Sequence, residues 1–332
     1  MPLSVIELAE KQRLALLKQD VIAINDLLTA YKGLYENLRP EILSLADAIA
    51  GMENPTPAAV RKLRQYTSLM DELAAESAKF GSYLEVQINA RALEALKLGD
   101  ANTAQLIRQA AAGNKALTAS LVRVPIEAIR ELSVFLAKGG ELYKRIQLMT
   151  GANVDRATEA IMRGVALGKN PRTIADLLNK SLGMNLTDAM RTMRTTQLWA
   201  YRSAAKANYI ANSKVVTGWI WVAKEDESVC AACLAMHGTK HPPDEILDGH
   251  YNCRCAMVPM TILDAEQPIA DGRGEEYFNS LTEDQQREML GPGKFEAWQE
   301  GKFQFSDLAS RTDNDVFGHM TVETTLKDLL GE

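Results

Sequence analysis

The chain of 332 residues is poor in aromatic side chains, proline and cysteine, and it contains no long apolar run. Its 11 prolines and four cysteines exclude a collagen-like protein and a small domain held together by many disulfides. No apolar run approaches the roughly 18–20 residues that a transmembrane helix needs, so we expect no membrane span. Glu7, Glu10 and Lys11 lie where a signal peptide keeps its apolar centre, so we expect no secretion by that route.

The remaining composition is that of a folded protein with an uneven charge. Hydrophobic residues make up 46% of the chain, and the length allows two domains or one domain with a helical appendage. The net charge of −6 is divided into −3 over residues 1–100, +11 over 101–224 and −14 over 225–332. Because the Lys and Arg residues of the middle part are spread through helical sequence, we favour solvated helix faces and attraction between the two blocks over direct DNA binding.

The first 150 residues are expected to form long helices. An apolar stripe predicts a helix over Val5–Ile24, and Pro57 can begin a second one over Ala58–Leu98. A further helical run is expected from Pro125 to Phe135. Breaks are expected at Arg39-Pro40, at 51–55, at Gly99-Asp100 and at Gly139-Gly140. This pattern fits an elongated interaction arm and an ordinary helical bundle about equally well.

From Asn153 onward the pattern predicts shorter helices. Asn170-Pro171 is a good N-cap followed by proline at the first helical position. Gly183 is expected to end that helix, and Thr187 to cap a following helix that extends to about residue 212.

Two strands are expected after these helices. Residues 215–222 combine β-branched and aromatic side chains without helical spacing, and residues 256–260 can form a second strand. Trp219 and Trp221 are expected to pack in the core rather than to stack on a ligand. We therefore expect these strands to form a hairpin, or a small mixed sheet that helices cover.

The C-terminal part has its own short elements. Residues 282–285 match a capping box, and Phe303-Gln304-Phe305 alternates like an edge strand. The expected fold is therefore mainly α with a small β element (α+β). It divides into a helical arm over 1–150, a compact domain with a Cys/His cluster over 151–262, and an acidic tail with short helices over 263–332.

The candidate site is a cluster of cysteines with one histidine. All four cysteines lie between positions 230 and 255, and the candidate metal ligands are Cys230, Cys233, His250, Cys253 and Cys255. A Cys-x-x-Cys pair directs two sulfurs to one point, and tetrahedral zinc needs four thiolate or imidazole ligands. Five candidates compete for four places, so we expect His250 or one of Cys253 and Cys255 to be left out.

Other arrangements could use the same cysteines. Two disulfides are possible, but a chain that is not secreted meets a reducing cytosol. A redox Cys-x-x-Cys pair needs a helix N-terminus after its first cysteine and leaves the second group unexplained. A catalytic zinc needs an open position and a nearby general base, and nothing in the spacing requires either. We therefore predict a structural zinc.

Nearby polar residues are expected to have minor roles. His237 and His241 could be ligands, but exposed polar histidines are the commoner case in such a loop. Residues 224–227 are expected to form a solvated turn. Arg254 could hydrogen-bond the thiolates or a nearby carboxylate.

These motifs, in this order, resemble the phage Mu F-like minor head proteins of the phage head morphogenesis family. The resemblance covers about residues 153–260, and residues 289–302 are similar to tails often found after that domain. One departure is that many relatives have Arg-Thr-Glu where this chain has Arg194-Thr195-Thr196-Gln197. The elements that carry the resemblance are Arg194-Thr195, Trp219 or Trp221, Asp226, Cys230, Cys233, Gly238, Pro242-Pro243, His250, Cys253-Arg254-Cys255 and Pro259.

The resemblance implies a structural, non-enzymatic minor component of a tailed-phage head. Such a protein is made in the host cytoplasm, binds the portal protein, or the major capsid or scaffold protein, during assembly, and remains in the virion in few copies. The basic residues of 101–224 could face packaged double-stranded DNA, in a contact that is independent of sequence and weakens with salt.

Two enzymatic alternatives remain open at this point. Asp248-Gly249-His250 and Asn252 beside a zinc knuckle faintly resemble a histidine-asparagine-histidine endonuclease, although the region is acidic and no second His–Asn pair follows Cys255. ADP-ribosyltransferases occur attached to this family, but their Arg, Ser-x-Ser and Glu-x-Glu elements are not discernible here as a set.

Overall fold

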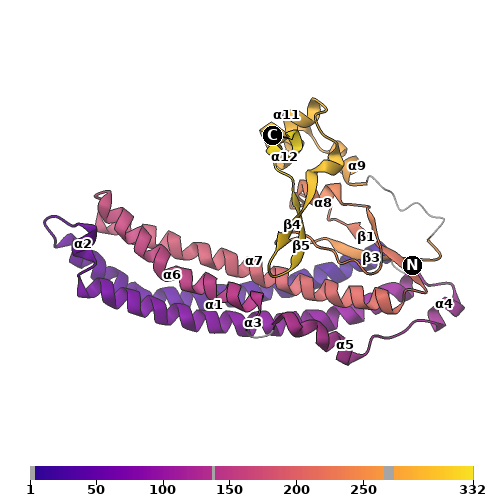
Figure 1. The fold of residues 1–332 in the computed structure, drawn as a ribbon, viewed down its shortest axis with the longest axis horizontal. Helices are drawn as coiled ribbons and strands as arrows, with labels where there is room; N and C mark the ends of the chain where they lie inside the picture. The colour runs from indigo at the N-terminus through magenta and orange to yellow at the C-terminus, as the bar shows by residue number, and fades with distance from the viewer. Residues whose placement is uncertain (1–3, 137–138, 265–272, 332) are drawn as a thin grey trace. The chain divides into compact units, whose positions relative to one another are not determined.

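The structure is a computed structural model that describes residues 4–136, 139–264 and 273–331. The chain forms two compact units (Figure 1). The first, which we call the sheet unit, comprises Met1–Lys18, Ala92–Val134 and Thr195–Glu332. The second, the helical unit, comprises Gln19–Arg91 and Phe135–Arg194. Each unit is therefore assembled from segments that are far apart in the sequence.

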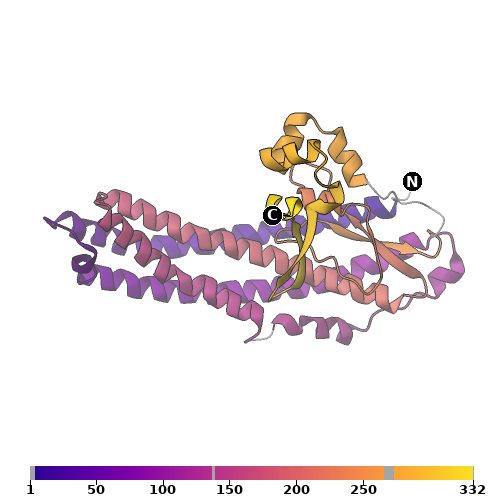
Figure 2. The same cartoon turned by 45° about the horizontal axis from the view of Figure 1, so that its top comes forward.

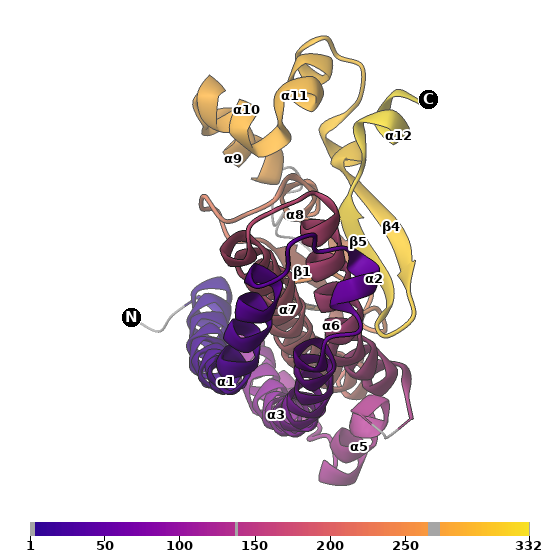
Figure 3. The ribbon, with the colours of Figure 1, turned by 90° about the vertical axis from the view of Figure 1, so that its left-hand side faces the viewer.

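The helical unit consists of long helices that lie side by side, seen end-on in Figure 3. Leucines at helical spacing, such as Leu34 and Leu38 in the first helix, are buried in its core. A buried polar pair also links two helices, since the Asn153 amide donates to the Ser77 hydroxyl at 2.9 Å. The helices are α1 (Val5–Ala50), α2 (Pro57–Val60), α3 (Arg64–Ala110), α6 (Glu141–Ala166) and α7 (Pro171–Ala211), of which α1, α3 and α7 continue into the sheet unit.

The sheet unit contains a three-stranded antiparallel sheet in the order β2-β1-β3. Its strands are β1 (Val216–Val222), β2 (Lys240–His241) and β3 (Ala256–Thr261). In the central strand, Trp219 pairs with His241 on one side and with Pro259 on the other. Trp219 and Trp221 are fully buried, which confirms their expected place in the core.

The rest of the sheet unit consists of short elements. Phe278, Phe295 and Leu308 form a second core with Ala231 and Leu234, so the C-terminal part packs against the segment that carries Cys230 and Cys233. The yellow hairpin in Figure 2 is β4–β5. The short elements are α4 (Lys115–Ala119), α5 (Ile126–Glu131), α8 (Ala231–Ala235), α9 (Arg273–Ser280), α10 (Glu283–Leu290), α11 (Pro292–Gln299), η2 (Phe305–Leu308), β4 (Ala309–Asn314), β5 (Gly318–Glu323) and α12 (Leu326–Leu330), with the 3-10 turn η1 (Leu132–Leu136) at the boundary between the units.

Several expected helix breaks are wrong. Helix α1 passes through Pro40, with Leu38 and Ile42 buried on either side of it. An interior proline costs about 3 kcal/mol, which burial of several leucine-sized side chains can offset. Helix α3 passes through Gly99, whose missing side chain allows close packing, because a Cβ there would lie 2.5 Å from the Tyr201 carbonyl oxygen.

The helices after Asn153 are also longer than expected. Helix α7 extends without a stop through Gly183 and Thr187, so neither residue has its expected role. A helical glycine costs only about 1 kcal/mol, and the buried Leu182 and Ala189 hold the helix on both sides of the expected break. The expected N-cap at Asn170 is confirmed, since its side-chain oxygen accepts from the Thr173 amide at 2.8 Å.

In the tail, one prediction is confirmed and another is wrong. Thr282 and Gln285 form the expected capping box at the start of α10. The segment Phe303–Phe305 is not a strand, because Phe303 and Phe305 both point into the second core and Phe305 begins a 3-10 turn. The true strands, β4 and β5, follow it and form a hairpin of six residue pairs.

The expected fold class is confirmed, since the described chain is mainly α with a small antiparallel sheet. The three-part division at residues 150 and 262 stays a prediction, and residues 265–272 of the expected tail lie outside the described residues. None of the described helices combines the length and the apolar character that crossing a membrane requires.

Candidate metal centre

Two separate segments of the sheet unit bring the Cys/His cluster together. Cys230 is the N-cap of α8 and Cys233 lies in its first turn. His250 and Cys253 come from the loop between β2 and β3, and Cys255 directly precedes β3. The fold therefore gathers the five candidate ligands in one place, and their role as metal ligands stays a prediction.

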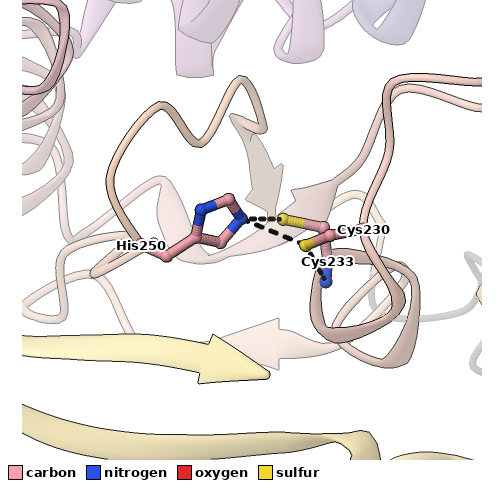
Figure 4. A group of neighbouring side chains, drawn as sticks. All are labelled: Cys230, Cys233 and His250. Carbon is pink, nitrogen blue, oxygen red and sulfur yellow. Dashed lines mark hydrogen bonds between the residues drawn. The ribbon is translucent and has the colours of Figure 1, made fainter. Parts of the chain in front are cut away.

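The ligand atoms form two overlapping groups, and the atoms within each group are close enough to share an ion. His250 Nε2 lies 3.1 Å from Cys230 Sγ and 3.2 Å from Cys233 Sγ (Figure 4). Cys233 Sγ lies 3.8 Å from Cys253 Sγ. Cys230, Cys233 and His250 form one group within 4.8 Å, and Cys233, Cys253 and Cys255 form another. Cys233 belongs to both groups and is thus the centre of the cluster.

The backbone of the His250 loop is shaped for this arrangement. Asn252 has a positive φ of 66°, which turns the chain sharply between His250 and Cys253. The backbone amide of Asn252 donates a hydrogen bond to the Thr195 hydroxyl at 3.2 Å. Gly249 leaves room for the sulfur, because a Cβ at this position would lie 2.3 Å from Cys253 Sγ. Both local features place His250 and Cys253 against the segment that carries Cys230 and Cys233.

His250 has the hydrogen bonding of a metal-binding histidine. Its Nδ1 lies 2.7 Å from the Tyr251 carbonyl oxygen, which can only accept a hydrogen bond. The Nδ1–H tautomer leaves the Nε2 lone pair directed at the two sulfurs of Cys230 and Cys233. An orienting carbonyl of this kind is a common second partner of zinc-bound imidazoles.

Arg202 of α7 is a buried partner of the cluster that the sequence analysis did not single out. Its Nη2 donates to the Cys253 and Cys255 carbonyl oxygens at 3.0 and 2.9 Å and lies 3.4 Å from Cys253 Sγ. A positive charge at this point offsets the negative charge of the thiolates. In the sequence, Arg202 is one of several basic residues of a single helix, and nothing there distinguishes it as a partner of the cysteines.

The pKa values divide the thiols into two pairs: those of Cys230 and Cys253 are lowered, whereas a hydrogen bond with Cys230 raises the pKa of Cys233 and burial raises that of Cys255. A hydrogen bond with Cys233 lowers the pKa of Cys230 to about 5, and His250 adds to the effect. Hydrogen bonds with Cys233 and Cys255, together with Arg202, lower the pKa of Cys253 as well. Burial lowers the pKa of His250, but the hydrogen bond with Cys230 and the charges of Cys253 and Cys230 raise it to about 9. Thiolate is the form of cysteine that binds a metal ion.

The donor set fits a soft or borderline metal ion. Three thiols and an imidazole, or four thiols, are the ligand sets of structural zinc. All four cysteines are free of disulfides in the structure. The helix N-terminus that a redox pair needs is present at Ala231, but Cys253 beside Cys233 supplies a further sulfur that such a pair does not use. The cluster can therefore hold a metal.

The other two histidines of this region are engaged elsewhere. His237 is buried rather than exposed, which corrects the expectation, and it accepts from the Ala223 amide while its Nε2 contacts Glu225 at 3.0 Å. His241 stacks on Trp219 with ring centroids 4.2 Å apart. Both histidines are held by the packing of the sheet.

The other polar residues that the sequence singled out have different surroundings. Arg254 donates to the Ser228 hydroxyl, and no thiolate or carboxylate of the described residues accepts a hydrogen bond from it. Gln197, which stands where many relatives have glutamate, is buried and its Oε1 has no hydrogen-bond partner. The neighbouring Arg194 forms an ion pair with Asp20 within the helical unit.

Asp248 connects the cluster loop to the C-terminal hairpin. Its carboxylate accepts from the Thr321 hydroxyl at 2.7 Å and from Arg311 Nε at 2.8 Å. Tyr251 of the same loop accepts from the Asn314 amide and packs edge-on against Phe317. The carboxylate beside His250 is thus used to hold the fold. The sequence missed this contact because the hairpin strands are too polar to stand out.

The comparisons with known proteins identify the region around the cluster. Residues 155–258, which include all five candidate ligands, match the family described as “Phage Mu protein F like protein”. Neither a curated protein nor a solved structure matches the chain. The family is one of structural phage head proteins, which supports head morphogenesis as the role and the virion as the location. The Cys/His cluster therefore lies within the part of the chain that is similar to the Phage Mu protein F like family.

Proposed function

We propose that this chain is a structural minor capsid protein of a tailed phage, which binds the portal protein and the major capsid or scaffold protein during head assembly. The observation that carries the proposal is the family match over residues 155–258. The engagement of Asp248 by Thr321 and Arg311 supports a structural rather than a catalytic role for the cluster. A general base beside a metal would need a free carboxylate or imidazole.

We further propose that the cluster holds one structural zinc with four of its five candidate ligands. The shared position of Cys233 and the orientation of His250 Nε2 support this assignment. When bound, zinc links α8 to the loop before β3, and its binding free energy becomes folding free energy. The ligands are drawn from Cys230, Cys233, His250, Cys253 and Cys255.

The parts of the chain have different roles in this proposal. The expected arm, residues 1–150, provides long helices as a docking face for head proteins, while the cluster domain over 151–262 and the tail over 263–332 form a compact support. The net charge of +11 over residues 101–224 would allow a non-specific contact with packaged double-stranded DNA. Such a contact would weaken steeply as the salt concentration rises.

The test is co-purification with head components of the same phage. We expect the tagged chain to elute with the portal oligomer, or with particles assembled from the major capsid protein, in size-exclusion chromatography. Mass spectrometry of purified virions is expected to detect the chain in few copies per particle. A chain that stays monomeric with both partners and is absent from virions would contradict the proposal.

A further inference from the structure

A groove in the sheet unit lies between the turn before α8 and the helices α9 and α10. It has a volume of about 520 Å³. Residues of the turn over 226–230, of α9, of α10 and of β5 line it. Cys230 is one of them, so the groove borders the Cys/His cluster. The proposed metal site does not use the rest of this groove.

Half-buried apolar side chains form one part of the groove. Val229, Tyr277, Leu281 and Met289 line it, and each also packs against the second core. They remain half-buried, because the core covers only part of each side chain. Tyrosine and methionine are enriched in the centres of protein–protein interfaces. The groove therefore offers apolar surface that a bound partner would cover.

Carboxylates line the same groove, and none of its described lining residues is basic. Asp226 and Glu323 form ion pairs with lysines that do not line the groove. Glu227 and Glu288 are exposed, and neither has an ion-pair partner within the described part of the chain. The groove thus presents two uncompensated negative charges, in a part of the chain whose net charge is −14 over residues 225–332.

The placement of these charges distinguishes between classes of ligand. A divalent ion needs several oxygen atoms around one point, but in the described ranges only the Cys/His groups bring three candidate ligand atoms within 4.8 Å of one another. A nucleic acid would be repelled, because its phosphates carry the same sign of charge as the groove. A ligand that fits carries separate positive charges together with apolar groups. A peptide segment that combines Lys or Arg with apolar residues has both.

We propose that this groove binds a basic segment of a partner protein, in which Lys or Arg side chains flank apolar ones. The positive charges lie against Glu227 and Glu288, and the apolar side chains cover Tyr277, Leu281 and Met289. The site is separate from the helices of residues 1–150 that serve as the docking face in the proposed function. Its test uses no phage head protein, so either proposal can fail without the other.

The experiment is a fluorescence anisotropy titration of the purified full chain with a fluorescein-labelled peptide, Lys-Leu-Lys-Leu-Lys. We expect saturable binding that weakens as the salt concentration rises, because exposed charges are screened. The peptide Lys-Ser-Lys-Ser-Lys has the same charge but no apolar side chains, so it should bind about tenfold more weakly. The peptide Glu-Leu-Glu-Leu-Glu should not bind. Equal binding of the two basic peptides, or no binding of Lys-Leu-Lys-Leu-Lys, would overturn the proposal.

Matched substitutions locate the binding site. Glu227→Gln and Glu288→Gln each remove one uncompensated charge from the groove and should each weaken the binding of Lys-Leu-Lys-Leu-Lys several-fold. Glu283→Gln removes an exposed charge from α10 that does not line the groove, and this control should bind the peptide like wild type. Equal weakening by all three substitutions would mean that only net charge matters and would overturn the proposal. Displacement of the peptide by an equal concentration of spermidine would assign the groove to a polyamine and would overturn it as well.

Discussion

The two units of the molecule are stabilised in different ways. The helical unit is held by apolar stripes on long helices, with a few polar pairs such as Asn153–Ser77. The sheet unit has a small sheet, several short helices and a cluster of thiols that converge from two segments. Small elements bury little apolar surface each, so a unit built from them gains most from an added cross-link. The two units should therefore differ in their dependence on a metal ion.

The largest effect that would sharpen this comparison is expected from Cys233→Ser. Cys233 belongs to both ligand groups, so its loss should remove metal binding and cost the sheet unit several kcal/mol. We expect amide hydrogen exchange to increase in β1 and β3 while α6 keeps its protection. Ser306→Ala, which alters an exposed hydroxyl of the sheet unit, is the control. An equal increase of amide hydrogen exchange in both units would contradict the expected difference in their dependence on the metal ion.

A somewhat smaller effect is expected from Arg202→Gln. The substitution removes the donor to the Cys253 and Cys255 carbonyl oxygens and the positive charge beside Cys253. Buried acceptors left without a donor cost about 1–3 kcal/mol each, so we expect a loss of about 3 kcal/mol, measured by urea unfolding. Metal affinity, measured by competition with a chromogenic chelator, should fall about 10–100-fold. Unchanged affinity would mean that Arg202 is not a partner of the metal site.

A matched pair of glycine substitutions compares the units directly. Gly249→Ala places a Cβ 2.3 Å from Cys253 Sγ and should destabilise the sheet unit by about 1–3 kcal/mol. Gly151→Ala lies in α6 with open space around it and should stabilise the helical unit by about 0.5–1 kcal/mol. Urea midpoints of the two variants should therefore shift in opposite directions. A shift in the same direction would show that the cluster loop is more compliant than its packing indicates.

The smallest effect concerns pH in the metal-free protein. The pKa of Cys230 is lowered from 9.0 to about 5, so the stability that it contributes is complete above pH 9 and is lost progressively as the pH falls from 9 to 5. The pKa of His250 is raised from 6.5 to about 9, so the stability that it contributes is complete below pH 6.5 and is lost progressively as the pH rises from 6.5 to 9. Between pH 6.5 and 9 the two changes oppose each other, so the urea midpoint of the chelator-treated chain should change little there and should fall as the pH drops from 6.5 to 5. His250→Gln removes the opposing contribution, so its midpoint should rise between pH 6.5 and 9, and an unchanged profile would contradict the pairing.

The sequence predicted the elements whose signals are local. The N-cap at Asn170, the strand around Trp219 and the cysteine spacing all act over a few residues, and the structure has each of them in place. Where tertiary packing determines the local structure, the prediction from the sequence was wrong. Gly99 reads as a break but permits a close approach to Tyr201.

The partners of the cluster were hidden for the same reason. Arg202 lies 51 residues before Cys253 and the hairpin residue Thr321 lies 73 residues after Asp248. Neither residue belongs to a recognisable motif, and the hairpin strands alternate too weakly in polarity to be found. Long-range polar contacts of this kind become visible only when the fold brings the segments together.

The central claim is that the cysteines and His250 hold one ion that keeps the sheet unit folded. Elemental analysis of the chain, purified from zinc-replete cells without chelator, tests it most directly. We expect about one zinc per chain in the wild type and little in Cys233→Ser. Only trace metal in a wild-type chain that is fully folded would contradict it.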